Sequence, residues 1–286
     1  MTKISIIIPA YNEEKGIKQT ILQIKKSIQN LDYKIEIIVV DDNSNDRTHE
    51  ILSSIKGIRV FRHSINKGYG ASLKTGIKST NSDYILIIDA DGTYPASEIP
   101  ALVKYCGKYD MVVGARVGEI VKIPFLRKPA KWLLKHFAQY LTKTKIPDLN
   151  SGLRIFKRKI ALRFMSMFPD GFSFTTTLTI ACFTNDYSIK YVTINYYERK
   201  GKSTISPIKD FIGFTNLIFR LTILFKPLNV FIPISMILFL AGALKLLRDF
   251  ILLGHFGVGG AIIILSAIQL AFMGMLAELI IKRNSL

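Results

Sequence analysis

The sequence has few of the residues from which disulfide frameworks and cysteine-based metal sites are built. Its 286 residues include two cysteines, four histidines and one tryptophan. Cys106 and Cys182 stand far apart, with no C-x-x-C pattern and no histidine close by. Neither a disulfide framework nor a zinc site is therefore predicted. We therefore interpret both cysteines as buried thiols in a reducing compartment.

An amino-terminal secretory signal is also missing. The apolar run at Ile4–Ile8 is too short for the hydrophobic region of a signal peptide, and it continues directly into Pro9. We therefore expect the greater part of the chain to stay in the cytosol.

Acidic residues are scarce: 21 Asp and Glu stand against 39 Lys and Arg, for a net charge of +18. Such a surplus is typical of proteins that bind nucleic acid or an anionic membrane surface. Hydrophobic residues make up 49% and the mean hydropathy is +0.28, which favours the membrane. No nucleic-acid partner is expected, because the basic residues surround apolar helices and precede apolar spans.

Short apolar runs alternate with helical patterns through the first part of the chain. Strands are predicted at 4–8, 35–40, 57–61, 84–88 and 111–113, and helices at 14–28, 48–55 and 71–79. This alternation predicts an α/β fold with a mostly parallel sheet and helices on both faces. Polar clusters follow Ile8, Val40 and Ile88, where ligands bind in such sheets.

Two apolar segments lie near the end of the chain, at about 228–247 and 257–281. Each is long enough to cross about 30 Å of hydrocarbon at about 1.5 Å per residue. We expect a transmembrane hairpin over 228–286, with Arg248-Asp249 and His255 in its short connection. Basic residues flank both ends, which predicts that both ends face the cytosol; they are Lys226, Lys282 and Arg283.

Two further segments combine basic and apolar residues at helical spacing. Residues 125–142 are predicted to form an amphipathic helix that lies on the membrane surface, and residues 206–227 a juxtamembrane amphipathic helix. An ordinary surface helix packed on the domain is the alternative for the first of them.

Asp89-Ala90-Asp91 follows the fourth predicted strand. Two carboxylates one residue apart can bind one hard divalent cation, Mg²⁺ or Mn²⁺, through oxygen ligands. Such a cation would neutralise charge on a departing diphosphate. Asp-x-Asp pairs are common in solvated loops, so the position at a strand end and the neighbouring motifs strengthen this interpretation.

Four motifs occur in order at suitable spacing: Pro9-Ala10-Tyr11-Asn12-Glu13-Glu14, Asp41-Asp42-Asn43-Ser44, Asn66-Lys67-Gly68-Tyr69-Gly70 and Asp89-Ala90-Asp91. With them the chain resembles family 2 glycosyltransferases of the Rossmann-like GT-A fold. Three more motifs resemble the polyprenyl-phosphate branch, which includes dolichyl-phosphate mannose and glucose synthases; they are Gly114-Ala115-Arg116, the segment 148–154 and Arg199-Lys200-Gly201-Lys202-Ser203. The resemblance covers about residues 4–210 and implies a catalytic domain at about 1–205.

The resemblance implies a role for each matching residue. The nucleotide-sugar pocket would include Pro9, Ala10, Tyr11, Glu13, Asp41, Lys67, Gly68, Asp89, Ala90 and Asp91. Within it, Asp41 would contact the base, and Asp89 and Asp91 would hold the ribose edge and the metal. The acceptor phosphate would be bound by Arg116, Arg154 and Arg199, with hydroxyl donors from Ser151 and Ser203. For each lone arginine, a surface charge or a helix-capping contact is the alternative.

The chain departs from the family pattern at two places. Thr93 stands where related enzymes often place a glutamine metal ligand, and a hydroxyl can ligate or hold a water. The segment 171–177 has threonines where many relatives carry an acidic residue. A hydroxyl acceptor needs a general base, whereas a lipid phosphate is already ionised. The missing carboxylate therefore fits a phosphate acceptor, although Asp148 or Asp170 could still serve as a base.

Together these features predict inverting transfer of one sugar from a UDP- or GDP-sugar to a polyprenyl or dolichyl phosphate, for glycan or glycoprotein assembly. The expected site is the cytosolic face of the cell membrane, or of the endoplasmic reticulum in a eukaryote. Expected partners are the donor, the lipid phosphate and membrane lipids, with a homo-oligomer left open. The alternatives are transfer to a hydroxyl lipid such as diacylglycerol, or a non-catalytic membrane partner in carrier-lipid translocation, against which the retained aspartates argue.

Overall fold

The computed structural model describes residues 2–117, 139, 144–171, 173–197, 220 and 223–285. The chain divides into two compact units, Met1–Phe211 and Ile212–Leu286. The amphipathic helices predicted at 125–142 and 206–227 lie largely outside the described residues, and Arg199 and Ser203 lie wholly outside them.

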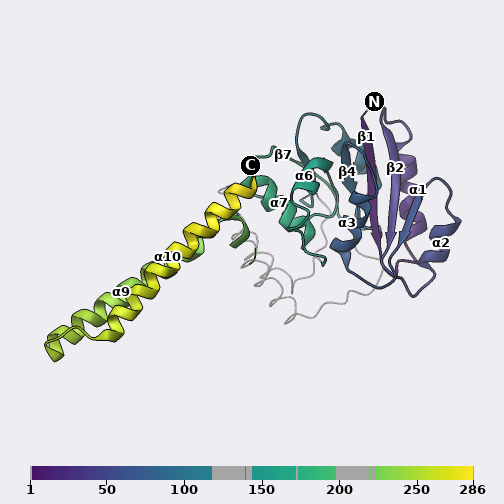
Figure 1. Cartoon of the computed structure of the whole chain (residues 1–286). Helices are drawn as coiled ribbons and strands as arrows, with labels where there is room; N and C mark the ends of the chain where they lie inside the picture. The colour runs from purple at the N-terminus through teal and green to yellow at the C-terminus, as the bar shows by residue number, and fades with distance from the viewer. Residues whose placement is uncertain are drawn as a thin grey trace. The chain divides into compact units, whose positions relative to one another are not determined.

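The amino-terminal unit is built on a seven-stranded sheet with the order β3-β2-β1-β4-β6-β5-β7 (Figure 1). Its strands are β1 (Lys3–Ala10), β2 (Lys34–Asp41), β3 (Arg59–Arg62), β4 (Tyr84–Ile87), β5 (Met111–Ala115), β6 (Arg154–Lys157) and β7 (Ile189–Thr193). Only β6 among them runs against the others, pairing antiparallel with β4 and β5. The predicted α/β fold with a mostly parallel sheet is confirmed, whereas β6 and β7 had no counterpart in the prediction.

Helices cover both faces of this sheet. One face carries α1 (Ile17–Ile28), α2 (Thr48–Ser54), η1 (Ala96–Glu98) and α4 (Ile99–Val103), and the other carries α3 (Tyr69–Lys78) and α6 (Arg158–Arg163). A further helix, α7 (Phe174–Thr184), precedes β7. Helix α1 begins at Ile17 rather than at the predicted residue 14, because residues 11–16 are used by the loop that leaves β1.

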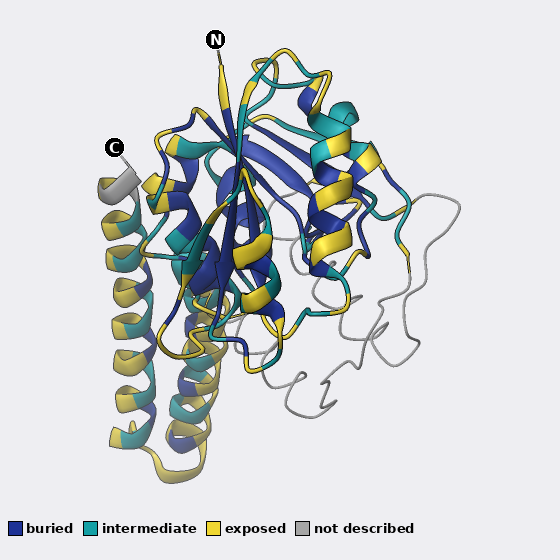
Figure 2. Ribbon diagram, turned by 90° about the vertical axis from the view of Figure 1, so that its right-hand side faces the viewer, coloured by how far each residue is buried: buried dark blue, intermediate teal, exposed yellow. Residues whose placement is uncertain are grey.

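Successive residues of each strand point to opposite faces of the sheet, so each strand contributes side chains to the hydrophobic layer on both faces. Buried residues of β1 pack on the apolar stripe of α1; they are Ile4, Ile6 and Ile8 against Ile17, Ile21 and Ile24. On the opposite face, Ile7 lies against Gly76 of α3. Figure 2 shows the result as dark blue strands between helices whose outer faces are yellow.

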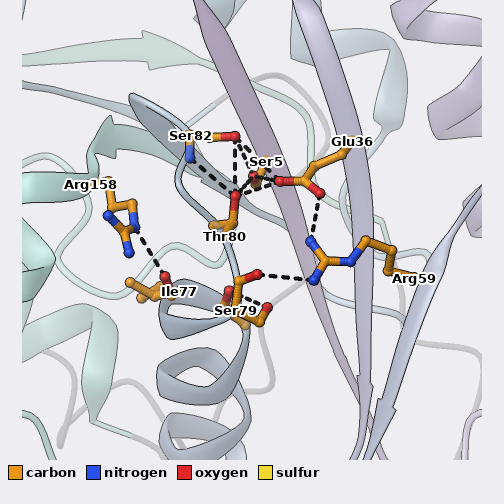
Figure 3. A network of polar contacts seen from close by, with 9 residues as sticks. Ser5, Glu36, Arg59, Ile77, Ser79, Thr80, Ser82 and Arg158 are labelled. Carbon is orange, nitrogen blue, oxygen red and sulfur yellow. Dashed lines mark hydrogen bonds and ion pairs between the residues drawn. The ribbon is translucent and has the colours of Figure 1, made fainter.

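A polar cluster ties the strands together near their amino ends (Figure 3). Glu36 of β2 accepts hydrogen bonds from Ser5 of β1 at 2.6 Å and from Nη1 of Arg59 of β3 at 2.9 Å. Thr80 and Ser82, which precede β4, join the same carboxylate. These bonds link β1, β2 and β3 to the loop before β4 at the edge opposite the sequence motifs.

The carboxyl-terminal unit contains α9 (Leu228–Leu253) and α10 (Val258–Ser285). Leu228–Leu253 and Val258–Ile281 are long and apolar enough to cross a membrane, with mean hydropathies of 2.3 and 2.1. The two helices pack along each other as the expected hairpin. Gly242 lets them approach closely, because a Cβ there would lie 2.8 Å from Cγ1 of Ile264.

The connection of the hairpin is shorter than predicted. Helix α9 continues to Leu253 and ends at Gly254, whose φ of 71° is the left-handed conformation common after helix ends. Lys245 pairs with Asp249 at 3.1 Å across one helical turn. Arg248 and Asp249 therefore belong to α9, whereas His255 lies in the connection as predicted.

Candidate active site at the carboxyl edge of the sheet

The parallel strands bring the sequence motifs to one edge of the sheet. Strands β1, β2 and β4 end there at Ala10, Asp41 and Ile87. Because β6 runs in the opposite direction, its first residue, Arg154, lies at this edge between Ile87 and Val113. The loops after β1, β2, β4 and β5 and the segment that enters β6 consequently meet at the same place.

Polar groups fix the loop after β1 to the loop after β2. The backbone N–H of Asn12 donates to Oγ of Ser44 at 3.0 Å, and the Asn12 side chain accepts from the backbone N–H of Asn45 at 2.8 Å. Asn12 has φ of 54°, a left-handed conformation that asparagine tolerates better than most residues. This loop leaves the Tyr11 ring 43% exposed.

The other residues predicted in the β1 loop are less accessible. Pro9 and Ala10 are the last residues of β1 and are buried, so only their backbone borders the edge. Glu13 is half-buried, and its backbone N–H donates to Oγ1 of Thr48 at 2.8 Å.

The Asp41 carboxylate lies beneath the surface of the site. Its side chain has no exposed area, and Oδ1 accepts from the backbone N–H of Ser44 at 2.9 Å. Oδ2 lies 3.2 Å from Nδ1 of His49 and 3.4 Å from Nε of Arg62, without hydrogen-bond geometry to either. His49 and Arg62 lie against this buried carboxylate, and the expected contact of Asp41 with the base stays a prediction.

Lys67 and Gly68 precede α3 at the same edge. Their backbone N–H groups donate to the Asp42 carboxylate at 2.9 and 2.7 Å. The Lys67 side chain is exposed, so the part of this motif that can meet a ligand is the ammonium group.

Asp89 and Asp91 follow β4 and are half-buried. The Tyr69 hydroxyl donates to Oδ1 of Asp89 at 3.0 Å. Thr93 donates to Oδ1 of Asp91 twice, from its backbone N–H at 3.1 Å and from its hydroxyl at 2.7 Å. Thr93 is itself fully buried, so this hydroxyl is placed to orient Asp91. Ala90 between the aspartates is buried, and its carbonyl accepts from Thr20 at 3.0 Å.

The segment that leads into β6 passes directly beside the first aspartate. A Cβ at Gly152 would overlap the Asp89 carboxylate, so a larger residue has no space here. The backbone N–H of Gly152 donates to the Tyr94 hydroxyl at 2.6 Å. The sequence analysis gave Tyr69 no role of its own, although it lies in the motif at 66–70, and Tyr94 lies outside the quoted motifs.

Arg116 forms a buried ion pair with Asp148. Its Nε and Nη2 donate to the two carboxylate oxygens at 2.7 and 2.8 Å, and Nη2 also donates to Asn150 at 2.6 Å. The guanidinium lies 5.2 Å from the centroid of the Tyr196 ring. Nη1 of Arg116 takes no part in these hydrogen bonds, so this nitrogen of the guanidinium could donate to a ligand.

Burial and pairing act in opposite directions on this ion pair. Burial alone would lower the pKa of Arg116, but the hydrogen bonds and the charge of Asp148 outweigh it, so the pKa is raised. Burial alone would raise the pKa of Asp148, and Arg116 outweighs it, so that pKa is lowered. Both side chains are therefore ionised at neutral pH.

Arg154 and Ser151 are fully buried beneath this edge, and neither has any exposed area. Nε of Arg154 donates to the Ser151 carbonyl at 2.9 Å, and Nη1 donates to the Thr175 carbonyl at 2.9 Å and to the Thr179 hydroxyl at 2.7 Å. Burial lowers the pKa of Arg154. Its guanidinium binds α7 to the 149–151 loop, and the expected contact of both residues with a phosphate stays a prediction.

The described residues contain no group of three or more His, Cys, Asp or Glu side chains arranged to hold a metal ion. Asp89 and Asp91 offer one or two carboxylates. That donor set fits Mg²⁺ or Mn²⁺, which complete their shells with substrate phosphates and water.

Residues 5–164 match the family model described as glycosyl transferase family 2. The chain belongs to glycosyl transferase family 2. Residues 226–282 of this glycosyltransferase match the GtrB C-terminal hairpin, and they coincide with α9 and α10. The matched hairpin and the two apolar helices indicate a membrane-anchored protein.

Curated relatives of this glycosyltransferase include three transferases. It is 29% identical over 285 residues to the low-salt glycan biosynthesis hexosyltransferase Agl6 of Haloferax volcanii, covering 95% of this chain and 67% of that one. It is 36% identical over 133 residues to the dolichol-phosphate mannosyltransferase of Pyrococcus furiosus, covering 44% and 37%. It is 26% identical over 282 residues to the undecaprenyl-phosphate 4-deoxy-4-formamido-L-arabinose transferase of Serratia proteamaculans, covering 95% and 84%. The glycosyltransferase thus spans only part of each relative.

Among solved structures, it is similar to glucosyl-3-phosphoglycerate synthase from Mycobacterium tuberculosis in complex with Mn²⁺, UDP and glucosyl-3-phosphoglycerate. The TM-score is 0.59 at 21% identity, over 77% of this chain and 79% of that one. This likeness confirms the Rossmann-like GT-A fold of the catalytic unit.

Proposed function

We propose that this glycosyltransferase transfers one sugar, with inversion, from a nucleotide diphosphate sugar to a polyprenyl phosphate at the cytosolic membrane face. The observation that carries the proposal is an oriented carboxylate pair, Asp89 and Asp91, in a chain that also has a membrane hairpin. Relatives named for dolichol phosphate and undecaprenyl phosphate support the acceptor class.

On the donor side, Asp89 and Asp91 would bind Mg²⁺ or Mn²⁺, which would neutralise the leaving nucleoside diphosphate. Tyr69 and Thr93 hold the two carboxylates in place before the donor arrives, and such preorganisation lowers the cost of stabilising charge in the transition state. The exposed Tyr11 ring and the Lys67 ammonium are the groups that would contact the nucleotide.

On the acceptor side, both carboxylates considered as a general base are already engaged. Asp148 accepts hydrogen bonds from Arg116, and Asp170 pairs with Lys74 at 2.8 Å. A hydroxyl acceptor would need such a base, whereas an ionised lipid phosphate can attack the anomeric carbon directly. The buried Asp148 pair supports a phosphate acceptor over a hydroxyl lipid, whereas the Asp170 pair is exposed. Nη1 of Arg116, together with Arg199 and Ser203, would bind that phosphate.

The test is a panel of UDP- and GDP-sugars supplied to the full-length protein in lipid nanodiscs. Each donor is offered with a short polyprenyl phosphate or with diacylglycerol, with and without EDTA. We expect a lipid-linked sugar from polyprenyl phosphate and one donor class, and no product in EDTA. Product from diacylglycerol alone would select the hydroxyl-acceptor alternative. Failure to bind any nucleotide sugar with Mn²⁺ or Mg²⁺ would instead favour a non-catalytic membrane partner.

A further inference from the structure

Asp42 is the centre of a buried polar cluster beside the proposed donor site. Its Oδ1 accepts hydrogen bonds from Nδ1 of His63 at 2.6 Å and from the backbone N–H of Lys67 at 2.9 Å. Its Oδ2 accepts from the backbone N–H of Gly68 at 2.7 Å. Asp42 is 4% exposed and His63 is 8% exposed, so water competes little for these bonds and they are strong.

His63 connects this carboxylate to helix α3. Its Nε2 lies 2.9 Å from Oγ1 of Thr75, and its backbone N–H donates to the Asp41 carbonyl at 2.9 Å. Nδ1 therefore faces the Asp42 carboxylate, and Nε2 faces the Thr75 hydroxyl. The ring is therefore oriented by the end of β2, by α3 and by Asp42 together.

The loop that Asp42 holds has little freedom on its other side. Gly68 has φ of 99°, and a Cβ there would lie 2.7 Å from the Asp170 carbonyl oxygen. The backbone N–H groups of Gly70 and Ala71 donate to the carbonyls of Gly171 and Asp170 at 3.1 and 2.9 Å. The residues from Lys67 to Ala71 are thus clamped between Asp42 and the 170–171 turn.

We infer that His63 is a positioning residue for the donor: through Asp42 it fixes the Lys67–Gly68 backbone, so that the Lys67 ammonium is directed at the nucleotide diphosphate. Without the imidazole, Asp42 would keep only the two bonds from the Lys67 and Gly68 amides, and its carboxylate would be held less firmly. The identity of the ligand rests on the proposed function, whereas the Asp42–His63 contact does not.

Two substitutions of the same residue test the inference. His63→Asn retains an N–H donor close to the position of Nδ1, and His63→Leu removes it. We expect His63→Leu to weaken binding of UDP or GDP with Mn²⁺ and to raise the donor KM roughly tenfold, which corresponds to about one hydrogen bond to a charged group. The kcat should change less, and His63→Asn should restore most of the affinity.

A second readout follows the backbone itself. Hydrogen exchange of the Lys67 and Gly68 amides should be slow in the wild type and faster in His63→Leu. Thr75→Val, which removes only the partner of Nε2, provides a milder variant if His63→Leu does not fold. Thr80→Val is the matched control, because it removes a buried hydroxyl at the opposite edge of the sheet (Figure 3). It should lower the melting temperature without changing donor affinity.

The outcomes separate the inference from the proposed function. The positioning role would be overturned if His63→Leu had a lower melting temperature but unchanged donor affinity and unchanged amide exchange. It would also be overturned if His63→Asn behaved like His63→Leu. If the wild type forms no lipid-linked sugar but binds a nucleotide in a His63-dependent way, the proposed acceptor fails and the positioning role is supported.

Discussion

At the scale of single residues, burial decides what each polar side chain of the site can do. Asp89 and Asp91 are half-buried and are oriented by hydroxyl groups. Arg154, which belongs to the motif at 148–154, has no exposed area and donates its hydrogen bonds to protein oxygens. The first pair is suited to bind a ligand, and the arginine is suited to hold the protein that surrounds it.

Asp91→Asn tests the carboxylate pair. The amide cannot neutralise a divalent cation, so transition-state stabilisation is lost and turnover should fall several hundred-fold or more. Initial rates of sugar transfer at saturating donor give the measurement. Asp32→Asn, at an exposed position, is the control and should retain wild-type rates. Near-normal turnover of the Asp91 variant would contradict a metal role.

Thr93→Val tests the group behind Asp91. The valine removes the hydroxyl bond to Oδ1 at 2.7 Å and keeps the backbone N–H bond, and loss of such supporting contacts costs about 10- to 100-fold in metal affinity. Thr93→Ser retains the hydroxyl and should stay close to wild type. Mn²⁺ titration of nucleotide-sugar binding measures the difference, and equal affinities in the valine and serine variants would rule out the orienting role.

At the scale of elements, Arg154 connects three parts of the chain: the start of β6, the 149–151 loop and α7. A buried guanidinium is stable only when its donors are paired. Gly152 follows this loop and lies against Asp89, so packing around Arg154 supports the backbone beside the proposed metal-binding carboxylates.

Arg154→Leu should therefore destabilise the catalytic unit by about 3 kcal/mol or more, because several buried carbonyl and hydroxyl groups lose their donor. The effect is measured by denaturant unfolding of the full-length protein in detergent, with far-UV circular dichroism as the signal. Arg163→Leu on the exposed side of α6 should change stability by less than about 0.5 kcal/mol. Equal stability of the two variants would refute the assignment.

The Glu36 cluster (Figure 3) predicts a pH dependence of stability. Burial alone would raise the pKa of Glu36, but hydrogen bonds from Ser5, Thr80 and Arg59 outweigh it, so its pKa lies below the ordinary value of about 4.3. A lowered carboxyl pKa contributes stability that is present above the unfolded pKa and is lost as the pH falls through the folded pKa.

Wild type should accordingly melt at a higher temperature than Glu36→Gln at pH 7, and the difference should shrink towards pH 3. Thermal melts of both proteins across this range give the comparison. A difference that is independent of pH would show that the ionised carboxylate is not what stabilises the cluster.

At the scale of the whole molecule, the hairpin determines where the catalytic unit can act. Helices α9 and α10 each span a bilayer by length and composition, and their connection is only four residues long, at 254–257. If both outer ends are cytosolic, as the flanking basic residues predict, the connection must face the opposite side of the membrane.

A cysteine label tests this topology. His255→Cys should react with a membrane-impermeant maleimide in intact cells, whereas Asn30→Cys, exposed on the catalytic unit, should react only after permeabilisation. The native thiols give little background at neutral pH, because burial raises the pKa of Cys106 and Cys182 to about 12. The reverse labelling pattern would place the active site on the outer face.

Patterns close together in the chain were enough to predict the mostly parallel sheet, the Asp89–Asp91 pair at a strand end and the apolar hairpin. Strand and helix periodicity, strand-end polar residues and apolar length are local properties, so they are readable without tertiary contacts. The extent of α9 was missed because Arg248 and Asp249 suggested a loop, whereas an ion pair across one helical turn keeps Asp249 in the helix.

Tertiary structure alone decided which of the motif residues reach the surface. Antiparallel β6 places the 148–154 segment beside Asp89 and buries Arg154 and Ser151 beneath it, and His49 and Arg62 close over Asp41. Burial depends on which distant segments pack over a side chain, and that is a property of long-range contacts rather than of spacing. The motifs therefore predicted which residues gather at the carboxyl edge of the sheet. The packing around them decides which side chains are exposed there and which are buried beneath.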